Sequence, residues 1–255
     1  MARAALLGRV NRRVGTVTAV RAETRTARTL VLDVPGWPGH LAGQHVDLRL
    51  TAEDGYSATR SYSIASASDG TRVEVTVERV PDGEVSPYLT EQIQIGTPLE
   101  LRGPLGGWFV WRPEQPEPVQ LVGGGSGLVP LMAMLRTRAR RGAPAPFRLL
   151  CSARDPGSLL YADELRRLTS TVDGAAPRLT VAWTRTAPDG EQRPPGRVDA
   201  ALVSAATWPA DLEPTCYACG PTGFVETVAD LLVAAGHDPA RIRTERFGPT
   251  GGARR

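Results

Sequence analysis

The sequence of 255 residues predicts a chain in two parts, an antiparallel β part followed by a parallel α/β part. Three observations lead to this prediction. In the first part, short runs of alternating apolar and polar residues end at Gly or Pro, a spacing typical of a sandwich or a barrel. In the second part, short apolar runs alternate with helical patterns, which is typical of a parallel sheet with helices on both faces. A proline-rich stretch, residues 111–120, separates the two patterns and predicts a linker.

The first part contains five runs that we predict to be strands, because their apolar residues recur with the period of two expected of a half-buried strand. These runs are residues 14–24, 27–36, 44–50, 71–80 and 97–106. A helix is predicted near residues 86–93, with Ser86 as the N-cap that would accept one of its free N–H groups.

The second part contains five predicted strands and four predicted helices in alternation. The strands are residues 119–122, 147–152, 179–184, 216–218 and 242–245. The helices are residues 126–141, 161–168, 198–205 and 223–235. Because a helix separates each strand from the next, the five strands are expected to run parallel.

Composition and charge narrow the class of protein. The formal net charge is only +3, from 30 basic and 27 acidic residues, and no basic run is interleaved with aromatic residues, so we expect no nucleic-acid partner. No stretch approaches the ~20 apolar residues of a membrane span, and the start of the sequence lacks a signal peptide's apolar region. We therefore expect a cytoplasmic protein, which we take to be a monomer. Three cysteines do not make a disulfide framework, and no metal site is predicted.

A glycine-rich loop opens the second part. In "LVGGGSGLVPLMAML", from Leu121, an apolar strand leads through Gly124, Gly125 and Gly127 into an amphipathic helix. Glycines let the backbone approach a ligand closely, and the free N–H groups at a helix start attract a pyrophosphate. The pattern departs from G-x-G-x-x-G, so a glycine-rich turn without a ligand stays open as the alternative.

Five segments, in order along the chain, resemble motifs of the ferredoxin–NADP⁺ reductase superfamily. "RSYSIAS", from Arg60, resembles the flavin-binding R-x-Y-S-x-x-S motif, and "GEVSPYL" resembles the pyrophosphate segment that follows it. "GPLGGWF", "GGGSGLVP" and "YACGP" resemble the G-P-x-G-x-F turn, the nicotinamide-side loop and the C-G-P segment. The resemblance implies an FAD-binding antiparallel β-barrel domain over residues 1–114. It also implies a five-stranded parallel α/β domain that binds the nicotinamide cofactor, over residues 115–255.

The family resemblance implies a set of flavin contacts. Arg60 would neutralise the pyrophosphate through its forked donors, Tyr62 would stack on the isoalloxazine, and Ser63 would approach the flavin N5 edge. FAD is favoured over FMN because the pyrophosphate segment is intact. Ser66 would either support the loop or contact the cofactor. The residues expected to line FAD are Arg60, Tyr62, Ser63, Ile64, Val77, Arg79, Gly83, Val85 and Ser86.

The nicotinamide cofactor is expected at the ends of the parallel strands. Ser152, Arg154 and Arg185 follow two of these strands and would bind a 2′-phosphate, so NADP(H) is favoured over NAD(H). As an alternative, Arg154 pairs with Asp155 or Asp163. The residues expected to bind this cofactor are Gly124, Gly125, Gly127, Ser152, Arg154, Arg185, Cys219, Gly220 and Pro221.

The resemblance places Cys219 beside the nicotinamide, in a positioning role. A dithiol of Cys216 and Cys219 is the alternative, and Cys151 is expected in the core. Glu245 and Phe247 would lie near the far face of the flavin, with Phe247 covering the ring until nicotinamide displaces it. The residues expected to take part in the reaction are Tyr62, Ser63, Cys219, Glu245 and Phe247. No acid–base triad is expected, and the three histidines are expected to be structural or exposed.

The resemblance implies an oxidoreductase that transfers hydride from NAD(P)H to FAD and then passes electrons to a separate carrier such as a ferredoxin. The carrier is expected to be a separate protein because the sequence has no four-cysteine cluster pattern. Two alternatives remain: a flavin or small-molecule reductase without a protein acceptor, and a non-catalytic electron-transfer subunit of a larger complex.

Overall fold

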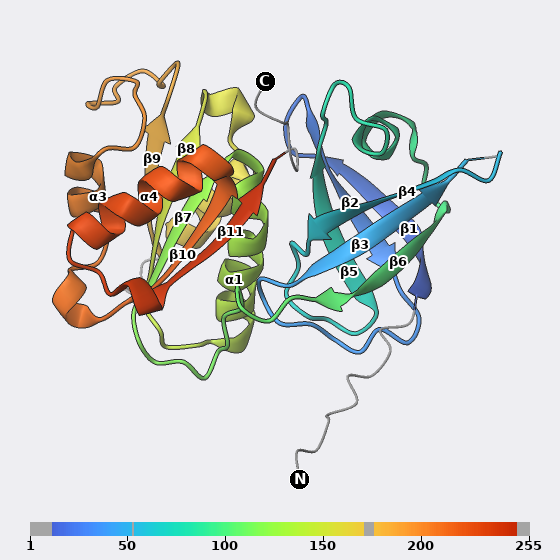
Figure 1. Ribbon diagram of the computed structural model, residues 1–255, viewed down its shortest axis with the longest axis horizontal. Coiled ribbons are helices and arrows are strands. Elements are labelled where there is room, and N and C mark those ends of the chain that lie inside the picture. The colour runs from blue at the N-terminus through green and yellow to red at the C-terminus, as the bar shows by residue number, and fades with distance from the viewer. Residues whose placement is uncertain (1–11, 53, 171–175, 249–255) are drawn as a thin grey trace, which may run out of the picture.

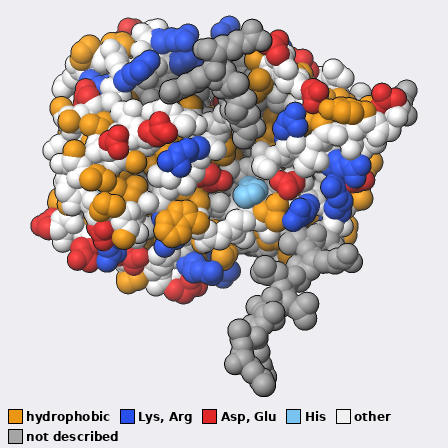
Figure 2. Space-filling model, viewed as in Figure 1, with side chains coloured by type: hydrophobic (Ala, Val, Ile, Leu, Met, Phe, Trp, Pro, Cys, Tyr) orange, Lys and Arg blue, Asp and Glu red, His pale blue; other side chains and the backbone are white. Residues whose placement is uncertain are grey.

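The computed structural model of the protein describes residues 12–52, 54–170 and 176–248 (Figure 1). The described chain forms two sheets that lie side by side, one built from β1–β6 and the other from β7–β11. We call these the barrel domain and the α/β domain. On the face seen in Figure 2, arginines and acidic side chains are interspersed over both domains. Within the described ranges, no helix is long and apolar enough to cross a membrane.

The barrel domain is a six-stranded antiparallel sheet with the strand order β4-β3-β6-β1-β2-β5. The two edge strands meet through a bridge between Ile64 and Val75, and Ala65 N–H donates to the Glu74 carbonyl at 2.7 Å. This contact closes the sheet and confirms the predicted antiparallel barrel. The strands are β1 (Arg12–Ala22), β2 (Ala27–Asp33), β3 (His45–Thr51), β4 (Ser57–Ser63), β5 (Arg72–Glu78) and β6 (Pro98–Leu105).

The helix predicted near residues 86–93 is a single π-helical turn, Tyr88–Gln92. The prediction that Ser86 caps it was wrong, because the cap position is Pro87, which has no side-chain donor or acceptor. The Ser86 hydroxyl instead accepts the Val80 N–H at 3.0 Å and so fixes the loop that leads into the turn.

The α/β domain is a five-stranded parallel sheet, as predicted, and its strand order is β11-β10-β7-β8-β9. Apolar residues on one sheet face, such as Leu121 and Tyr217, pack against α1 and α2, while those on the other face, such as Val122, pack against α3 and α4. The strands are β7 (Val119–Gly124), β8 (Phe147–Ala153), β9 (Arg178–Trp183), β10 (Thr215–Pro221) and β11 (Ile242–Phe247), and the helices are α1 (Leu128–Arg141), α2 (Ala162–Thr169), α3 (Ala200–Ala206) and α4 (Thr222–Ala234).

The segment predicted as a linker begins inside the core. Trp111 is fully buried, forms a bridge with Ala42, and packs edge-on against Phe147 with ring centroids 4.9 Å apart. An aromatic ring of this size buries enough apolar surface to outweigh the local turn signals of the neighbouring prolines. The two domains therefore share one apolar cluster, which includes Ala65 and Phe109 of the barrel side and Leu131 of α1.

Candidate functional site

The strand that carries the flavin-like motif, β4, lies at the edge of the barrel where it closes against β5. Tyr62 is half-buried, and burial raises the pKa of its phenol to about 12 against the opposing charge of Arg60, so the hydroxyl stays a donor. Ser63 is buried, yet its Oγ has no hydrogen-bond partner. Ile64 is buried at the closure of the sheet.

The α/β domain presents a second polar group toward this edge. Glu245 on β11 is the register partner of Cys219 on β10. Its Oε1 lies 4.0 Å from Nδ1 of His45, which is the register partner of Ser63 in the barrel. Glu245 Oε2 is buried without a hydrogen-bond partner, and burial raises the pKa of this carboxyl to about 7. Polar groups of the two domains therefore face one another across β3 and β11.

These residues fit a flavin. A buried polar atom without a partner is unfavourable, and both Ser63 Oγ and Glu245 Oε2 are of this kind. The polar edge of an isoalloxazine supplies donors and acceptors for such atoms. Arg60 lies near the predicted pyrophosphate segment, where its Nη2 pairs with Glu84 at 3.2 Å. Both side chains of this pair are more than half exposed, so the pair is weak and a phosphate can replace the carboxylate.

The other predicted flavin residues line β5 and the loop after it. Val77 and Val85 are buried, which leaves only their backbone groups for a ligand. Gly83 N–H donates to the Val80 carbonyl in a tight turn. Arg79 pairs with Glu91 at 2.7 Å. Ser66 supports the loop, because its hydroxyl accepts the Glu74 N–H at 3.1 Å.

A cavity of about 710 Å³ opens at the carboxyl ends of the parallel strands. It brings together six of the residues predicted to bind a nicotinamide cofactor, namely Gly124, Gly125, Ser152, Arg154, Arg185 and Pro221. It also includes Ser126, Arg197, Phe224 and Thr227, which we did not assign to the cofactor. Phe224 follows the C-G-P segment by three residues. This short separation in sequence could have indicated that Phe224 lies near the cofactor.

Three predicted residues, Gly127, Cys219 and Gly220, do not line this cavity but form its support. A Cβ at Gly127 would lie 2.1 Å from the Cys219 carbonyl oxygen, so only glycine allows this loop to touch β10. A Cβ at Gly124 or Gly220 would meet the Phe224 ring at 2.8–2.9 Å. The loop, β10 and the start of α4 are therefore packed without spare space.

Arg154 forms its ion pair across the domain boundary. Its Nη2 lies 3.6 Å from Glu78 Oε1 of β5, so the alternative pairing with Asp155 or Asp163 was wrong. Arg185 N–H donates to the Arg154 carbonyl at 3.0 Å, which holds these two backbone segments together. Glu78 and the loop residues Thr24 and Thr26 line the cavity from the barrel side.

The two cysteines of the C-x-x-C sequence do not form a dithiol. Cys216 packs with the α3 and α4 cluster, whereas Cys219 packs with the α1 cluster on the other sheet face. Burial, followed by the charge of Glu245, raises the pKa of Cys219 well above its usual value, so the thiol stays protonated. Cys151 is buried in the core, as predicted.

Phe247 ends β11 as the register partner of Pro221 and is partly buried against the shared apolar cluster. The C-terminal residues 249–255 lie outside the described residues.

Comparisons with known proteins identify the two domains. Residues 15–110 match the family model of the oxidoreductase FAD-binding domain, and residues 121–230 match that of the oxidoreductase NAD-binding domain. The chain is 30% identical to the ferredoxin–NAD(P)⁺ reductase component of the naphthalene 1,2-dioxygenase system of Pseudomonas putida, over 93% of this chain and 69% of that protein. It is 33% identical to the glycine betaine monooxygenase reductase subunit of Chromohalobacter salexigens, over 82% of this chain and 56% of that protein.

A solved structure shows the same arrangement of both domains. The flavohem-like FAD/NAD-binding domain of nitric oxide dioxygenase from Vibrio cholerae superposes with a TM-score of 0.81 at 27% identity, over 93% of this chain and 99% of that one. An FAD-binding barrel joined to an NAD-binding α/β domain defines a flavoprotein oxidoreductase. The chain belongs to the ferredoxin–NAD(P)⁺ reductase family, as an NAD(P)H-dependent FAD oxidoreductase.

Proposed function

We propose that this protein takes electrons from NADPH and passes them through FAD to a separate iron–sulfur carrier such as a ferredoxin. The observation that supports the proposal is that two of the three unpartnered buried side-chain atoms of the described residues, Ser63 Oγ and Glu245 Oε2, come one from each domain. Glu245 is the register partner of Cys219, and Pro221, two residues further along β10, lines the cavity. A nicotinamide bound in the cavity would therefore meet a flavin bound in the barrel near these two atoms. Relatives named as reductase components of oxygenase systems support the same role, although the chain spans only 56–69% of their length.

The residues have distinct roles in this proposal. Bound FAD would supply the redox chemistry, since it accepts a hydride and releases electrons one at a time. Arg60 and the Gly83–Ser86 segment hold its pyrophosphate, and Tyr62 covers its ring. Ser63 and Glu245 bind the polar edge, and Cys219 positions the nicotinamide through the glycine-rich loop that its backbone supports. Phe247 is the proposed cover of the exposed ring face. We place the boundary between the two domains after residue 114, between β6 and β7.

We infer a preference for NADPH from the residues at the end of the cavity beyond β8 and β9. Ser152, Arg154 and Arg185 gather there with Arg197, and Glu78 is the acidic residue among those that line the cavity. A 2′-phosphate carries extra negative charge that arginine forks bind well.

Two measurements test the proposed function. Stopped-flow reduction of the FAD-loaded protein by NADPH and NADH, run in parallel, is expected to show fast bleaching with both and tighter binding of NADPH. Cytochrome c reduction is then expected only when a ferredoxin is added. Protein that takes up no FAD, or fast turnover of free flavin without any carrier, would contradict the proposal.

A further inference from the structure

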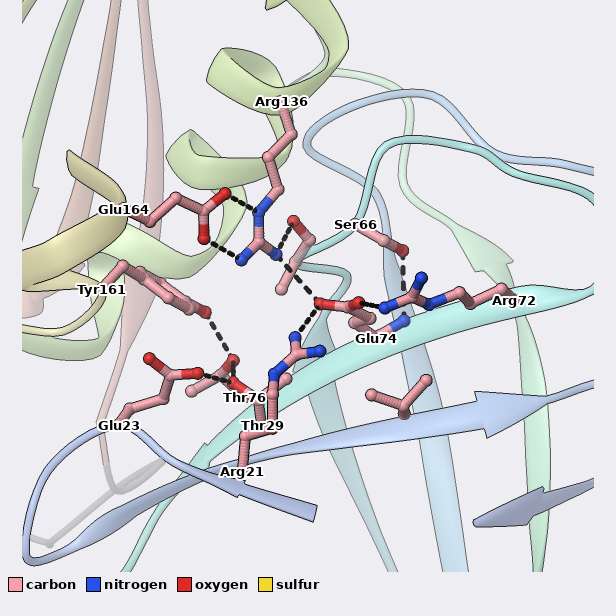
Figure 3. Close-up of polar contacts among 12 residues, drawn as sticks. Arg21, Glu23, Thr29, Ser66, Arg72, Glu74, Thr76, Arg136, Tyr161 and Glu164 are labelled. Atoms are coloured by element: carbon pink, nitrogen blue, oxygen red, sulfur yellow. Dashed lines mark hydrogen bonds and ion pairs between the residues drawn. The ribbon is translucent and has the colours of Figure 1, made fainter. Parts of the chain in front are cut away.

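A partly buried cluster of charged side chains joins the two domains on the side where α1 meets β5 (Figure 3). At its centre is Arg136 of α1, whose side chain is 15% exposed. Arg136 Nε and Nη2 donate to the two carboxylate oxygens of Glu164, at 2.8 and 2.6 Å, within the α/β domain. Arg136 Nη1 donates to the Ala65 carbonyl at 2.9 Å and to Glu74 Oε2 at 3.2 Å, both in the barrel domain. One guanidinium therefore binds both domains.

The barrel groups that Arg136 contacts lie where the barrel closes. Ala65 and Glu74 are hydrogen-bonded to each other through their backbones. Ala65 is two residues beyond Ser63, in the segment that carries the flavin motif. If Arg136 shifts relative to the barrel, the helix that carries it therefore also shifts relative to the predicted flavin edge.

In the α/β domain, α1 connects Arg136 to the glycine-rich loop. The helix begins at Leu128, directly after Gly127, and continues without a break past Arg136. Eight residues of helix correspond to about 12 Å along the axis. Because the helix is stiff and Glu164 of α2 holds Arg136 on its other side, the loop cannot move relative to β4 unless the contacts of Arg136 break.

We propose that Arg136 is a positioning residue that fixes the angle between the two domains and so sets the approach of the nicotinamide to the flavin. This inference rests on the proposed function, in which each domain binds one of the two cofactors. Reactive distances in such a transfer are about 3–3.5 Å, and a displacement of about 1 Å is costly. A small change in the angle between the domains therefore has a large effect on the rate.

A second contact of the same kind comes from Tyr161, just before α2. Its hydroxyl donates to Thr76 of β5, and its backbone has the left-handed φ of 56° that side-chain-bearing residues rarely adopt. The ring also lies under the Arg136 guanidinium, 5.0 Å from its centroid. An unfavourable backbone conformation is thus retained at a residue that contacts the other domain.

The protein is expected to fold when Arg136 is replaced, because the acidic partners of Arg136 keep other ion pairs or can be hydrated. Glu74 keeps its ion pairs with Arg21 and Arg72, so its buried carboxylate is not left without a cation. Glu164 is 28% exposed and can be hydrated. Arg136→Met retains the apolar length of the side chain over the Tyr161 ring and is expected to fold. Arg166→Met is the control. Within the described residues, the Arg166 side chain forms an ion pair with Asp163 of the same helix and with no residue of the barrel domain.

The first test measures the domain angle directly. Spin labels are attached to Thr51→Cys on β3 and Ser204→Cys on α3, both exposed positions, while Cys151, Cys216 and Cys219 are buried and do not react. Pulsed electron paramagnetic resonance is expected to give one narrow distance distribution for the parent and for Arg166→Met, and a broader one for Arg136→Met. Equal widths in all three proteins would overturn the proposal.

The second test measures hydride transfer in the FAD-loaded protein. Arg136→Met is expected to lower the stopped-flow rate constant for flavin reduction by about tenfold or more, and to weaken the long-wavelength charge-transfer absorbance. FAD content and the Kd for the nucleotide should stay unchanged, and Arg136→Lys should recover part of the rate. An unchanged rate and absorbance in Arg136→Met would overturn the proposal. Failure of NAD(P)H to reduce the parent would instead refute the proposed function, while the label distances would still test the role of Arg136.

Discussion

Individual residues in this protein carry buried polar atoms without hydrogen-bond partners, at a cost to stability. Ser63 Oγ and Glu245 Oε2 are buried without partners, and each such atom costs about 1–3 kcal/mol. The other buried hydroxyls of the described residues are satisfied, as when the Thr29 and Thr76 hydroxyls hydrogen-bond to each other at 2.7 Å. The third such atom among the described residues, Trp111 Nε1, lies in the core shared by the two domains, whereas Ser63 Oγ and Glu245 Oε2 lie at the proposed flavin edge.

Glu245 makes the stability of the flavin-free protein depend on pH. Burial raises the pKa of this carboxyl from 4.5 to about 7, so the folded protein holds the proton more tightly than the unfolded chain. The free energy of unfolding should therefore fall as the pH rises from about 4.5 to 7, by roughly 3 kcal/mol from this group. His45, at 4.0 Å, and Cys219 face the same carboxyl.

Glu245→Gln is expected to remove this contribution, because the amide does not ionise. Urea unfolding of the parent and the variant at pH 5 and pH 8 measures it. The variant should gain stability relative to the parent at pH 8 and differ little at pH 5. The same difference at both pH values would contradict the pKa of Glu245.

Arg60 should govern the affinity for FAD. A charge-assisted hydrogen bond to phosphate contributes about 1.5–3 kcal/mol, so Arg60→Ala is expected to weaken FAD binding roughly 10- to 100-fold. Glu84 competes for the same guanidinium at 3.2 Å, so Glu84→Ala should bind FAD at least as tightly as the parent. Fluorescence titration of flavin-free protein measures both. Equal weakening in the two variants would count against a phosphate contact by Arg60.

At the scale of elements, local sequence patterns predicted most of the fold. Strands and helices were found because their apolar residues repeat with the period of two or 3.6 that burial on one face requires. Gly142 ends α1 in the left-handed conformation, with a φ of 60°, which glycine adopts without strain. Ser86 and Trp111 were misread because their contacts, with Val80 and with Ala42 and Phe147, depend on residues that are not adjacent in the pattern.

The contact between the glycine-rich loop and β10 gives a prediction about stability. A Cβ at Gly127 would overlap the backbone of Cys219, at 2.1 Å from its carbonyl oxygen, and neither segment has space to move. Gly127→Ala should lower the free energy of unfolding by roughly 3 kcal/mol. Gly223→Ala is the matched control, since a Cβ there meets nothing within 4 Å and α4 gains up to about 0.5–1 kcal/mol. Chemical denaturation measures both, and an unchanged midpoint for Gly127→Ala would contradict the packing described.

At the scale of the whole molecule, the sequence predicted two cofactor-binding domains but not how they are joined. The flavin motif and the glycine-rich loop are continuous segments, so each can be recognised from its own residues in the sequence. Arg136 and Glu74 are 62 residues apart and lie in ordinary helix and strand patterns. Only the folded chain brings such pairs together, and the geometry between the cofactors depends on them.

We expect the ion pair between Arg154 and Glu78 to connect the proposed nucleotide preference with the barrel domain. The Glu78 carboxylate lies 3.6 Å from the Arg154 guanidinium, where it would compete with the 2′-phosphate of the proposed NADPH and repel it. Glu78→Gln is expected to tighten NADPH binding about two- to fivefold, the range of an exposed ion pair, while NADH binding stays unchanged. Arg154→Ala combined with Arg185→Ala should act in the opposite direction, raising the KM for NADPH much more than that for NADH. If the two nucleotides responded equally to both variants, this end of the cavity would not bind the 2′-phosphate, and the preference for NADPH would have to be abandoned.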